Sequence, residues 1–222
     1  MINGWMHIAC MLNGYEIACE LHGRLLQSGL YDVANKINIS LVGNINQQVK
    51  LIGNVFSRYD KYKVIYQSEN ITNYEWPCLL HMQEHALGSC FYIHSKGASN
   101  ETRPDVPVNI QTNLRLWRDL MCHYVISKHD LCNKIIDSGI DACGPLLTNS
   151  NSTQQHFSGN FWWASDKHIK SLPVEVDRAN RNKAETWITN MTGKFYNLYE
   201  APQNADFYGF DGCVNPFGAY KV

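Results

Sequence analysis

The sequence lacks the features that would mark a membrane or secreted protein. No run approaches the roughly 18–20 apolar residues that span a bilayer, and polar residues (His7, Asn13, Glu16) interrupt the N-terminal segment, so we expect neither a signal peptide nor a membrane anchor. Nineteen Lys and Arg against 20 Asp and Glu give a net charge of −1, so no excess charge attracts nucleic acid. We therefore expect a cytoplasmic protein without a membrane span or a nucleic-acid partner.

The eight cysteines do not form metal-binding or disulfide patterns. No two lie within five residues of each other, so the C-x-x-C spacing of zinc sites is absent, and most lie in apolar runs. We expect reduced, buried thiols. They are Cys10, Cys19, Cys78, Cys90, Cys122, Cys132, Cys143 and Cys213.

Three common catalytic motifs are also missing. There is no G-x-x-x-x-G-K-[ST] and no G-x-G-x-x-G after the first strand, which argues against a P-loop NTPase and a nicotinamide dehydrogenase. There is no G-x-S-x-G, so a serine hydrolase is not expected.

Apolar runs alternate with amphipathic stretches, which predicts one α/β domain. The chain is 45% hydrophobic and 12% aromatic, enough to form a core. We expect a mixed, mostly parallel central sheet flanked by helices. The predicted strands are 6–12, 37–42, 62–66, 90–93 and 140–143, and the predicted helices 15–28, 77–87, 110 onward, 129–138 and 178–190.

The ends of the predicted strands are the place to search for a site, because open α/β sheets bind ligands beyond their carboxyl ends. His94-Ser95-Lys96-Gly97 follows the buried strand 90–93, and Lys96 with backbone N–H groups suits a phosphate. An ordinary turn with an exposed Lys explains these residues equally well. The loop 98–109 has the length and composition of a functional loop.

The segment from His156 to Ser165 is the densest aromatic feature of the chain. Its mixture of aromatic, amide and hydroxyl groups suits sugar recognition, and a packed aromatic strand is the competing interpretation. Neighbouring side chains of a strand point to opposite faces, so one of Trp162 and Trp163 should face a ligand and the other the core. The other candidates here are His156, Ser158, Gly159 and Asn160.

Isolated titratable residues give weaker signals. Glu185 lies on a predicted helix, where a solvent-exposed carboxylate is the usual outcome. His81 and His85, spaced i and i+4, suit zinc only with a third ligand, which the sequence does not supply.

Four blocks resemble a family of small glycosyltransferase-like proteins of bacteria and large DNA viruses, over about residues 5–200. They are Tyr74-Glu75-Trp76-Pro77, Phe91-Tyr92-Ile93-His94-Ser95-Lys96-Gly97, Trp117-Arg118-Asp119-Leu120-Met121, and His156-Phe157-Ser158-Gly159-Asn160-Phe161-Trp162-Trp163-Ala164 followed by Ile169-Lys170-Ser171-Leu172-Pro173. The resemblance implies a GT-A-type, Rossmann-like fold. It implies a nucleotide-binding half (about 1–100) and an acceptor half (about 101–200), in a bacterial or virus-infected cell. The last residues are aromatic, contain Gly and Pro and have no helical period, which indicates a C-terminal wrap (201–222).

The resemblance also implies an activity: transfer of a sugar from a nucleotide-diphosphate sugar to a glycan or other hydroxyl acceptor, with inversion favoured. His94, Lys96, Gly97 and Arg118 would bind the donor diphosphate. The nucleotide would contact Ala9, Cys10 and Met11, and the acceptor or sugar would contact the 156–163 residues named above.

Glu185 is then the candidate catalytic base, with Asp166 and Asp177 next. The chain departs from the family pattern in having no Asp-x-Asp, so Lys96 is expected to replace Mn²⁺ or Mg²⁺, and a bound divalent cation stays an open alternative.

Two other functions compete with glycosyl transfer. A non-catalytic carbohydrate-binding module would keep the aromatic strand and ignore nucleotides. A zinc hydrolase would use His81 and His85.

Overall fold

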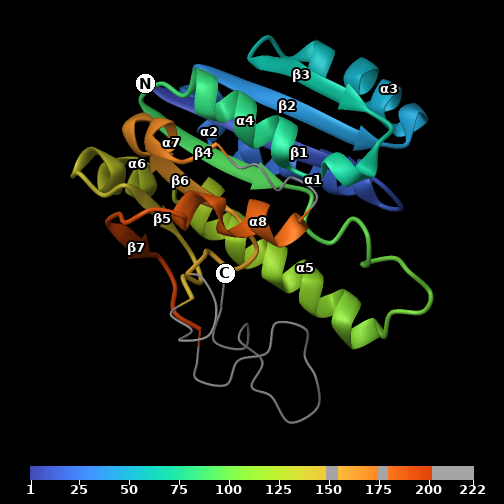
Figure 1. Ribbon diagram of the computed structural model, residues 1–222. Helices are drawn as coiled ribbons and strands as arrows, with labels where there is room; N and C mark the ends of the chain where they lie inside the picture. Colours follow the sequence, from blue (N-terminus) through green and yellow to red (C-terminus); the bar gives the residue numbers. More distant parts are fainter. Residues whose placement is uncertain (149–154, 175–179, 202–222) are drawn as a thin grey trace.

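Seven strands form one sheet in the part of the chain that the computed structural model describes, residues 1–148, 155–174 and 180–201 (Figure 1). The strand order is β3-β2-β1-β4-β6-β5-β7. Strand β6 runs antiparallel to both of its neighbours, and the other pairs are parallel. The strands are β1 (Ile2–Cys10), β2 (Lys36–Gly43), β3 (Tyr62–Ser68), β4 (Ser89–His94), β5 (Ala142–Gly144), β6 (Trp162–Ser165) and β7 (Phe195–Asn197). The predicted α/β class with a mixed, mostly parallel sheet is confirmed.

Helices cover both faces of this sheet (Figure 1). Apolar residues of α1, α2, α3, α5 and α6 form the core on one face, and those of α4, α7 and α8 form the core on the other. The helices are α1 (Gly14–Gln27), α2 (Leu30–Val33), α3 (Ile45–Asn54), α4 (Trp76–His85), α5 (Val108–Cys122), α6 (His129–Asp137), α7 (Asp166–Ser171) and α8 (Arg181–Thr186). Short helical turns lie at Phe56–Arg58, Ile71–Asn73 and Trp187–Thr189, and a π-helical turn at His123–Ser127.

Side-chain alternation along β1 explains the two cores. Met6 and Ile8 point to the α1 face, whereas Trp5 packs with α4 on the opposite face. His7 and Ala9 lie on the Trp5 face by the same alternation, and β1 pairs His7 with His94 of β4. The sheet therefore presents a polar row toward α4 at its carboxyl end.

Several predicted boundaries need correction. The first strand ends at Cys10 and begins at Ile2, four residues before the predicted start, and the last predicted helix is a short α8 followed by a 3₁₀ turn. α2, α3, α7 and β7 were not predicted. Residues 202–222, most of the expected C-terminal wrap, lie outside the described residues, as does Asp177.

Candidate functional site

The order in which strands are added to the sheet reverses at β1: β2 and β3 lie on one side of it, and β4 lies on the other. From β1 the chain proceeds to β2 and β3, and it then returns to form β4 beside β1. Loops that leave the carboxyl ends of such a pair diverge and open a crevice, which is where ligands bind in open α/β sheets. The residues after Cys10 and after His94 therefore border the expected ligand position.

Two pockets meet at this edge. The first, which we call the β1/β4 pocket, has a volume of about 260 Å³, and the second, the α8 pocket, about 380 Å³. Three residues, Lys96, Gly97 and Ser99, line both. The β1/β4 pocket is also lined by His7, Ala9, Met11, Val42, Ile71, Tyr74, Glu75, His94, Ser95 and Ala98, and the α8 pocket by Asn100, Leu114, Trp117, Ser158, Gly159, Asn182 and Glu185.

The turn after β4 is fixed to the end of β1. Ser95 N–H donates to the carbonyl of His7 at 3.0 Å, and the amide of Ala9 donates to Ser95 Oγ at 2.8 Å. Gly97 has φ +95°, a left-handed conformation that favours glycine. The N–H groups of Gly97 and Ser99 find no acceptor within the described residues. Two available amides beside a lysine form a suitable cradle for an anion.

Lys96 carries the positive charge of this turn. The residue is 9% exposed, and its Nζ lies 4.2 Å from the centroid of the Trp117 ring, within range of a cation–π interaction. Lys96 lines both pockets, and the Trp117 ring over which its ammonium group lies belongs to the α8 pocket.

Arg118 of α5 is hydrogen-bonded to the backbone of this turn. Its Nη1 donates to the carbonyl of Lys96 at 2.9 Å and to Glu101 Oε2 at 2.5 Å, and its Nη2 pairs with Glu20 Oε2 at 2.8 Å. Arg118 and Glu101 are 3% and 4% exposed. The guanidinium is thus surrounded by two carboxylates and a carbonyl, and Arg118 lines neither pocket.

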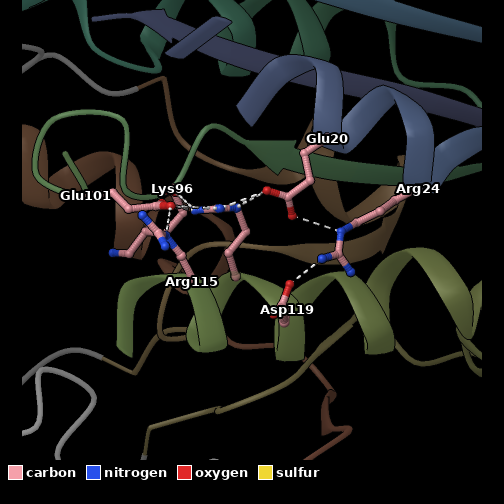
Figure 2. A network of polar contacts seen from close by, with 7 residues as sticks. Glu20, Arg24, Lys96, Glu101, Arg115 and Asp119 are labelled. Carbon is pink, nitrogen blue, oxygen red and sulfur yellow. Dashed lines mark hydrogen bonds and ion pairs between the residues drawn. The ribbon is translucent and has the colours of Figure 1, made fainter. Parts of the chain in front are cut away.

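The network extends to α1 (Figure 2). Arg24 Nε donates to Glu20 Oε1 at 2.9 Å, and Arg24 also pairs with Asp119, while Arg115 pairs with Glu101 at 2.6 Å. Burial works to raise the pKa of Glu20, but hydrogen bonds and ion pairing with Arg118 and Arg24 outweigh it, so this pKa is lowered. These charges join α1, α5 and the loop after β4.

The predicted acceptor residues separate into two groups. Ser158 and Gly159 line the α8 pocket together with Lys96. Asn160 is 1% exposed and acts structurally: its Nδ2 donates to Glu75 Oε2 at 2.5 Å, and its Oδ1 accepts from an indole. His156 lines neither pocket and contacts the hydroxyl of Thr148.

The prediction that one of Trp162 and Trp163 faces a ligand is wrong. Trp162 and Trp163 point to opposite faces as predicted, but both are 0% exposed. Trp162 Nε1 donates to Asn160 Oδ1, and Trp163 Nε1 donates to the carbonyl of Val125, both at 2.8 Å. Because β6 is an interior strand with helices on both faces, neither indole forms a sugar-binding surface.

Glu185 is half-buried on α8 and lines the α8 pocket. Its carboxylate makes no hydrogen bond or ion pair with any described residue, so it is available to a ligand. Asp166, the next candidate, lies elsewhere, at the start of α7, and accepts from the amide of Gly88 at 2.9 Å.

The predicted nucleotide contacts are partly corrected. Ala9 and Met11 line the β1/β4 pocket, whereas Cys10 is 1% exposed and packs in the α1-side core. Burial raises the pKa of the Cys10 thiol to about 12, so it is unreactive. The described cysteines are all free thiols, as predicted.

Sequence reasoning missed the buried polar wall of the β1/β4 pocket. Glu75, at the N-cap of α4, is 5% exposed, and His7 is 3% exposed. Tyr74 has φ +46°, uncommon for a non-glycine residue and a feature that clusters at functional sites. The signal was present in the period-2 placement of His7 beside Ala9 and in the Tyr74–Pro77 block.

The described residues contain neither a metal-binding cluster nor a helix that could span a membrane. No group of three or more His, Cys, Asp or Glu side chains among them is arranged to hold a metal ion. His81 and His85 are stacked at 4.1 Å, and His81 Nδ1 accepts from Trp5 Nε1. None of the described helices is long and apolar enough to cross a membrane.

Comparison with known proteins adds a distant likeness. No family model matches the chain, and no curated protein matches it. Among solved structures, it is similar to 4-diphosphocytidyl-2C-methyl-D-erythritol synthase from Anaerococcus prevotii, at 9% identity and a TM-score of 0.43 over 90% of this chain and 88% of that chain. It is also similar to CMP:2-keto-3-deoxy-manno-octonic acid synthetase complexed with CTP, at 9% identity and a TM-score of 0.43 over 90% of each chain. A likeness at this level carries no argument about activity.

Proposed function

We propose that the protein is a glycosyltransferase that moves a sugar from a nucleotide-diphosphate sugar to a hydroxyl group of a glycan or other acceptor. The observation that carries the proposal is the turn Lys96–Ser99, which lines two adjoining pockets with one cation and two available backbone amides. A donor substrate with a nucleoside at one end, a diphosphate in the middle and a sugar at the other end fits this arrangement.

The nucleoside occupies the β1/β4 pocket, against Ala9 and Met11, and the diphosphate lies at Lys96. All residues that line this pocket come from the first 99 residues of the chain. The sugar and the acceptor hydroxyl occupy the α8 pocket, where Ser158 and Gly159 supply polar contacts.

The reaction is a displacement at the anomeric carbon with inversion. Glu185 accepts the proton of the acceptor hydroxyl as the new C–O bond forms, and the bond from the anomeric carbon to the diphosphate oxygen breaks. The nucleoside diphosphate leaves with an added negative charge, which Lys96 and the amides of Gly97 and Ser99 stabilise. Arg118 acts indirectly, by holding the carbonyl of Lys96.

A divalent cation is not required by this scheme. The turn presents an ammonium group where a carboxylate pair would hold Mn²⁺ or Mg²⁺, and a cation there would be repelled. The non-catalytic alternative keeps the missing Asp-x-Asp as its argument but loses the aromatic strand as a sugar-contact surface, because Trp162 and Trp163 are buried on both faces of β6.

Calorimetric titration tests the proposal. The protein should bind a nucleoside diphosphate from a panel of UDP, GDP, ADP and CDP, with equal affinity in EDTA and in MnCl₂. The nucleotide sugar of the same base should then transfer its sugar to a glycan panel. Binding of free glycan without nucleotide binding would favour a carbohydrate-binding module, and affinity restored by MnCl₂ alone would show that the cation is needed.

A further inference from the structure

Glu75 is a buried carboxylate in the wall of the β1/β4 pocket. It occupies the N-cap position of α4 without a side-chain capping hydrogen bond and is 5% exposed, yet it is among the residues that line this pocket. Burying an ionised carboxylate is unfavourable unless donors surround it, so its hydrogen-bond partners decide what it is for.

One of its two oxygens is satisfied by the protein. Oε2 accepts from the hydroxyl of Tyr92 at 2.8 Å and from Asn160 Nδ2 at 2.5 Å. Oε1 lies 3.6 Å from His94 Nδ1, too far for a direct hydrogen bond, and accepts none from the described residues. A carboxylate oxygen can accept two hydrogen bonds, so Oε1 keeps its acceptor capacity.

Among the described residues, the groups nearest to the Glu75 carboxylate include two histidines, but no Lys or Arg forms an ion pair with it. His94 Nε2 donates to the carbonyl of Gly159 at 2.9 Å, which turns its Nδ1 edge toward Glu75. Burial lowers the pKa of His7 to about 4, so His7, beside His94 in the strand register, is neutral at pH 7. No Lys or Arg among the described residues lies within 4.0 Å of the carboxylate.

We infer that Glu75 recognises the nucleoside part of the ligand: its Oε1 accepts a hydrogen bond from an O–H or N–H group. This inference rests on the proposed function. A phosphate would be repelled by the carboxylate and attracted to Lys96, so the two residues impose an orientation on any ligand in this pocket. A nucleoside diphosphate presents donors at one end and charge at the other, whereas pyrophosphate presents only the charge.

The test compares nucleoside diphosphate with inorganic pyrophosphate as probes of wild-type protein, Glu75→Gln and Glu69→Gln. Glu69 is an exposed residue after β3 and serves as the matched control. Loss of a hydrogen bond to a charged group predicts that Glu75→Gln weakens nucleoside diphosphate binding roughly 10-fold to 100-fold. Pyrophosphate affinity should not change, and Glu69→Gln should behave as wild type.

Each other result overturns the inference. Equal weakening of both probes means that Glu75 supports the fold of the turn, and no weakening means that it contacts no ligand. If only the full nucleotide sugar binds more weakly, Glu75 contacts the sugar. If wild-type protein binds neither probe, the proposed function itself fails, which separates that failure from the others.

A second arm uses the ligand alone, in case Glu75→Gln does not fold. Wild-type protein is titrated with the 2′-deoxy, the 3′-deoxy and the base N-methylated analogues of the bound nucleotide. The analogue that lacks the recognised donor should bind about 10-fold more weakly, and its identity separates the ribose hydroxyls from base N–H. Unchanged affinity for all three analogues would leave Oε1 without a ligand donor and overturn the inference.

Discussion

His94 Nε2 donates to the carbonyl oxygen of Gly159 at 2.9 Å, which bonds the last residue of β4 to the turn that precedes β6. His94 lines the β1/β4 pocket and Gly159 lines the α8 pocket. Gly159 has φ +90°, and a Cβ there would lie 2.3 Å from Met121 Sδ, so the turn is pressed against α5. This hydrogen bond therefore joins a wall residue of one pocket to a wall residue of the other, beside a turn that packs closely on α5.

Removing the charge of Lys96, which lines both pockets, should reduce both binding and turnover. Lys96→Met keeps an unbranched side chain at this position and removes the ammonium group that lies over Trp117. Turnover should fall roughly 100-fold, because one electrostatic donor to the leaving diphosphate is lost. Steady-state transfer assays measure it, with Lys170→Met, an exposed residue of α7, as the control. If Lys96→Met had the turnover of the wild type, Lys96 would have no role in the reaction.

Neutralising the candidate base should separate chemistry from donor binding. Glu185→Gln should lower turnover by roughly 10²–10⁴-fold, the usual range for a general base, and leave nucleoside diphosphate affinity unchanged. Exposed Glu16 on α1 supplies the matched variant, Glu16→Gln, which should transfer sugar normally. Should Glu185→Gln keep full activity, another group accepts the proton.

Much of the fold could be predicted because its strands are buried. Alternating apolar and polar residues predict β2, an apolar run predicts β4, and the buried stripe Ile17, Leu21 and Leu25 predicts α1. Helix α3 could not be found in this way, because it buries a polar side chain and exposes an apolar one. It buries Gln48, whose Nε2 donates to the carbonyls of Gly43 and Ser68, and it exposes Val49.

The candidate site also combines features that local sequence predicts with features that depend on tertiary contacts. The turn at Lys96 follows from the rule that ligands bind at strand ends. Alternation placed Trp162 and Trp163 on opposite faces but could not show that helices cover both. Glu75 is an ordinary acid in the sequence, and only tertiary contacts with Tyr92 and Asn160 reveal a buried carboxylate.

The ion network under the turn should be a stability determinant. Arg118→Met removes the buried cation that Glu20 and Glu101 share, and leaves each carboxylate with a single, more exposed arginine, Arg24 or Arg115. Because Glu101 is almost fully buried, the free energy of unfolding should fall by up to about 3 kcal/mol, the lower end of the range for breaking a buried pair. Urea denaturation measures the change.

The matched control for that variant is Arg103→Met, which breaks an exposed pair with Asp105 and should have no measurable effect. Nucleoside diphosphate affinity should also fall in Arg118→Met, since the carbonyl of Lys96 loses its donor. Equal stabilities of the two variants would contradict a structural role for the network.

Acid should destabilise the protein through His7 before most carboxylates titrate. Burial, opposed by the charge of Glu75 and assisted by that of His94, lowers the pKa of His7 to about 4 in the folded state, against about 6.5 when unfolded. The unfolded state therefore binds the proton first as pH falls below 6.5. Stability that is present above pH 6.5 is lost progressively toward pH 4, by up to about 1.4 kcal/mol per pH unit.

Other groups titrate in the same range, so the informative quantity is the difference between wild type and His7→Asn. Burial also lowers the pKa of His22, His81 and His123, and these contributions cancel in the comparison. Urea unfolding at pH 7, 6 and 5 should give a shallower loss of stability for His7→Asn than for wild type. Parallel pH profiles for wild type and His7→Asn would mean that folding does not change the pKa of His7, and a steeper loss of stability for His7→Asn would mean that the folded state, not the unfolded state, binds this proton more tightly.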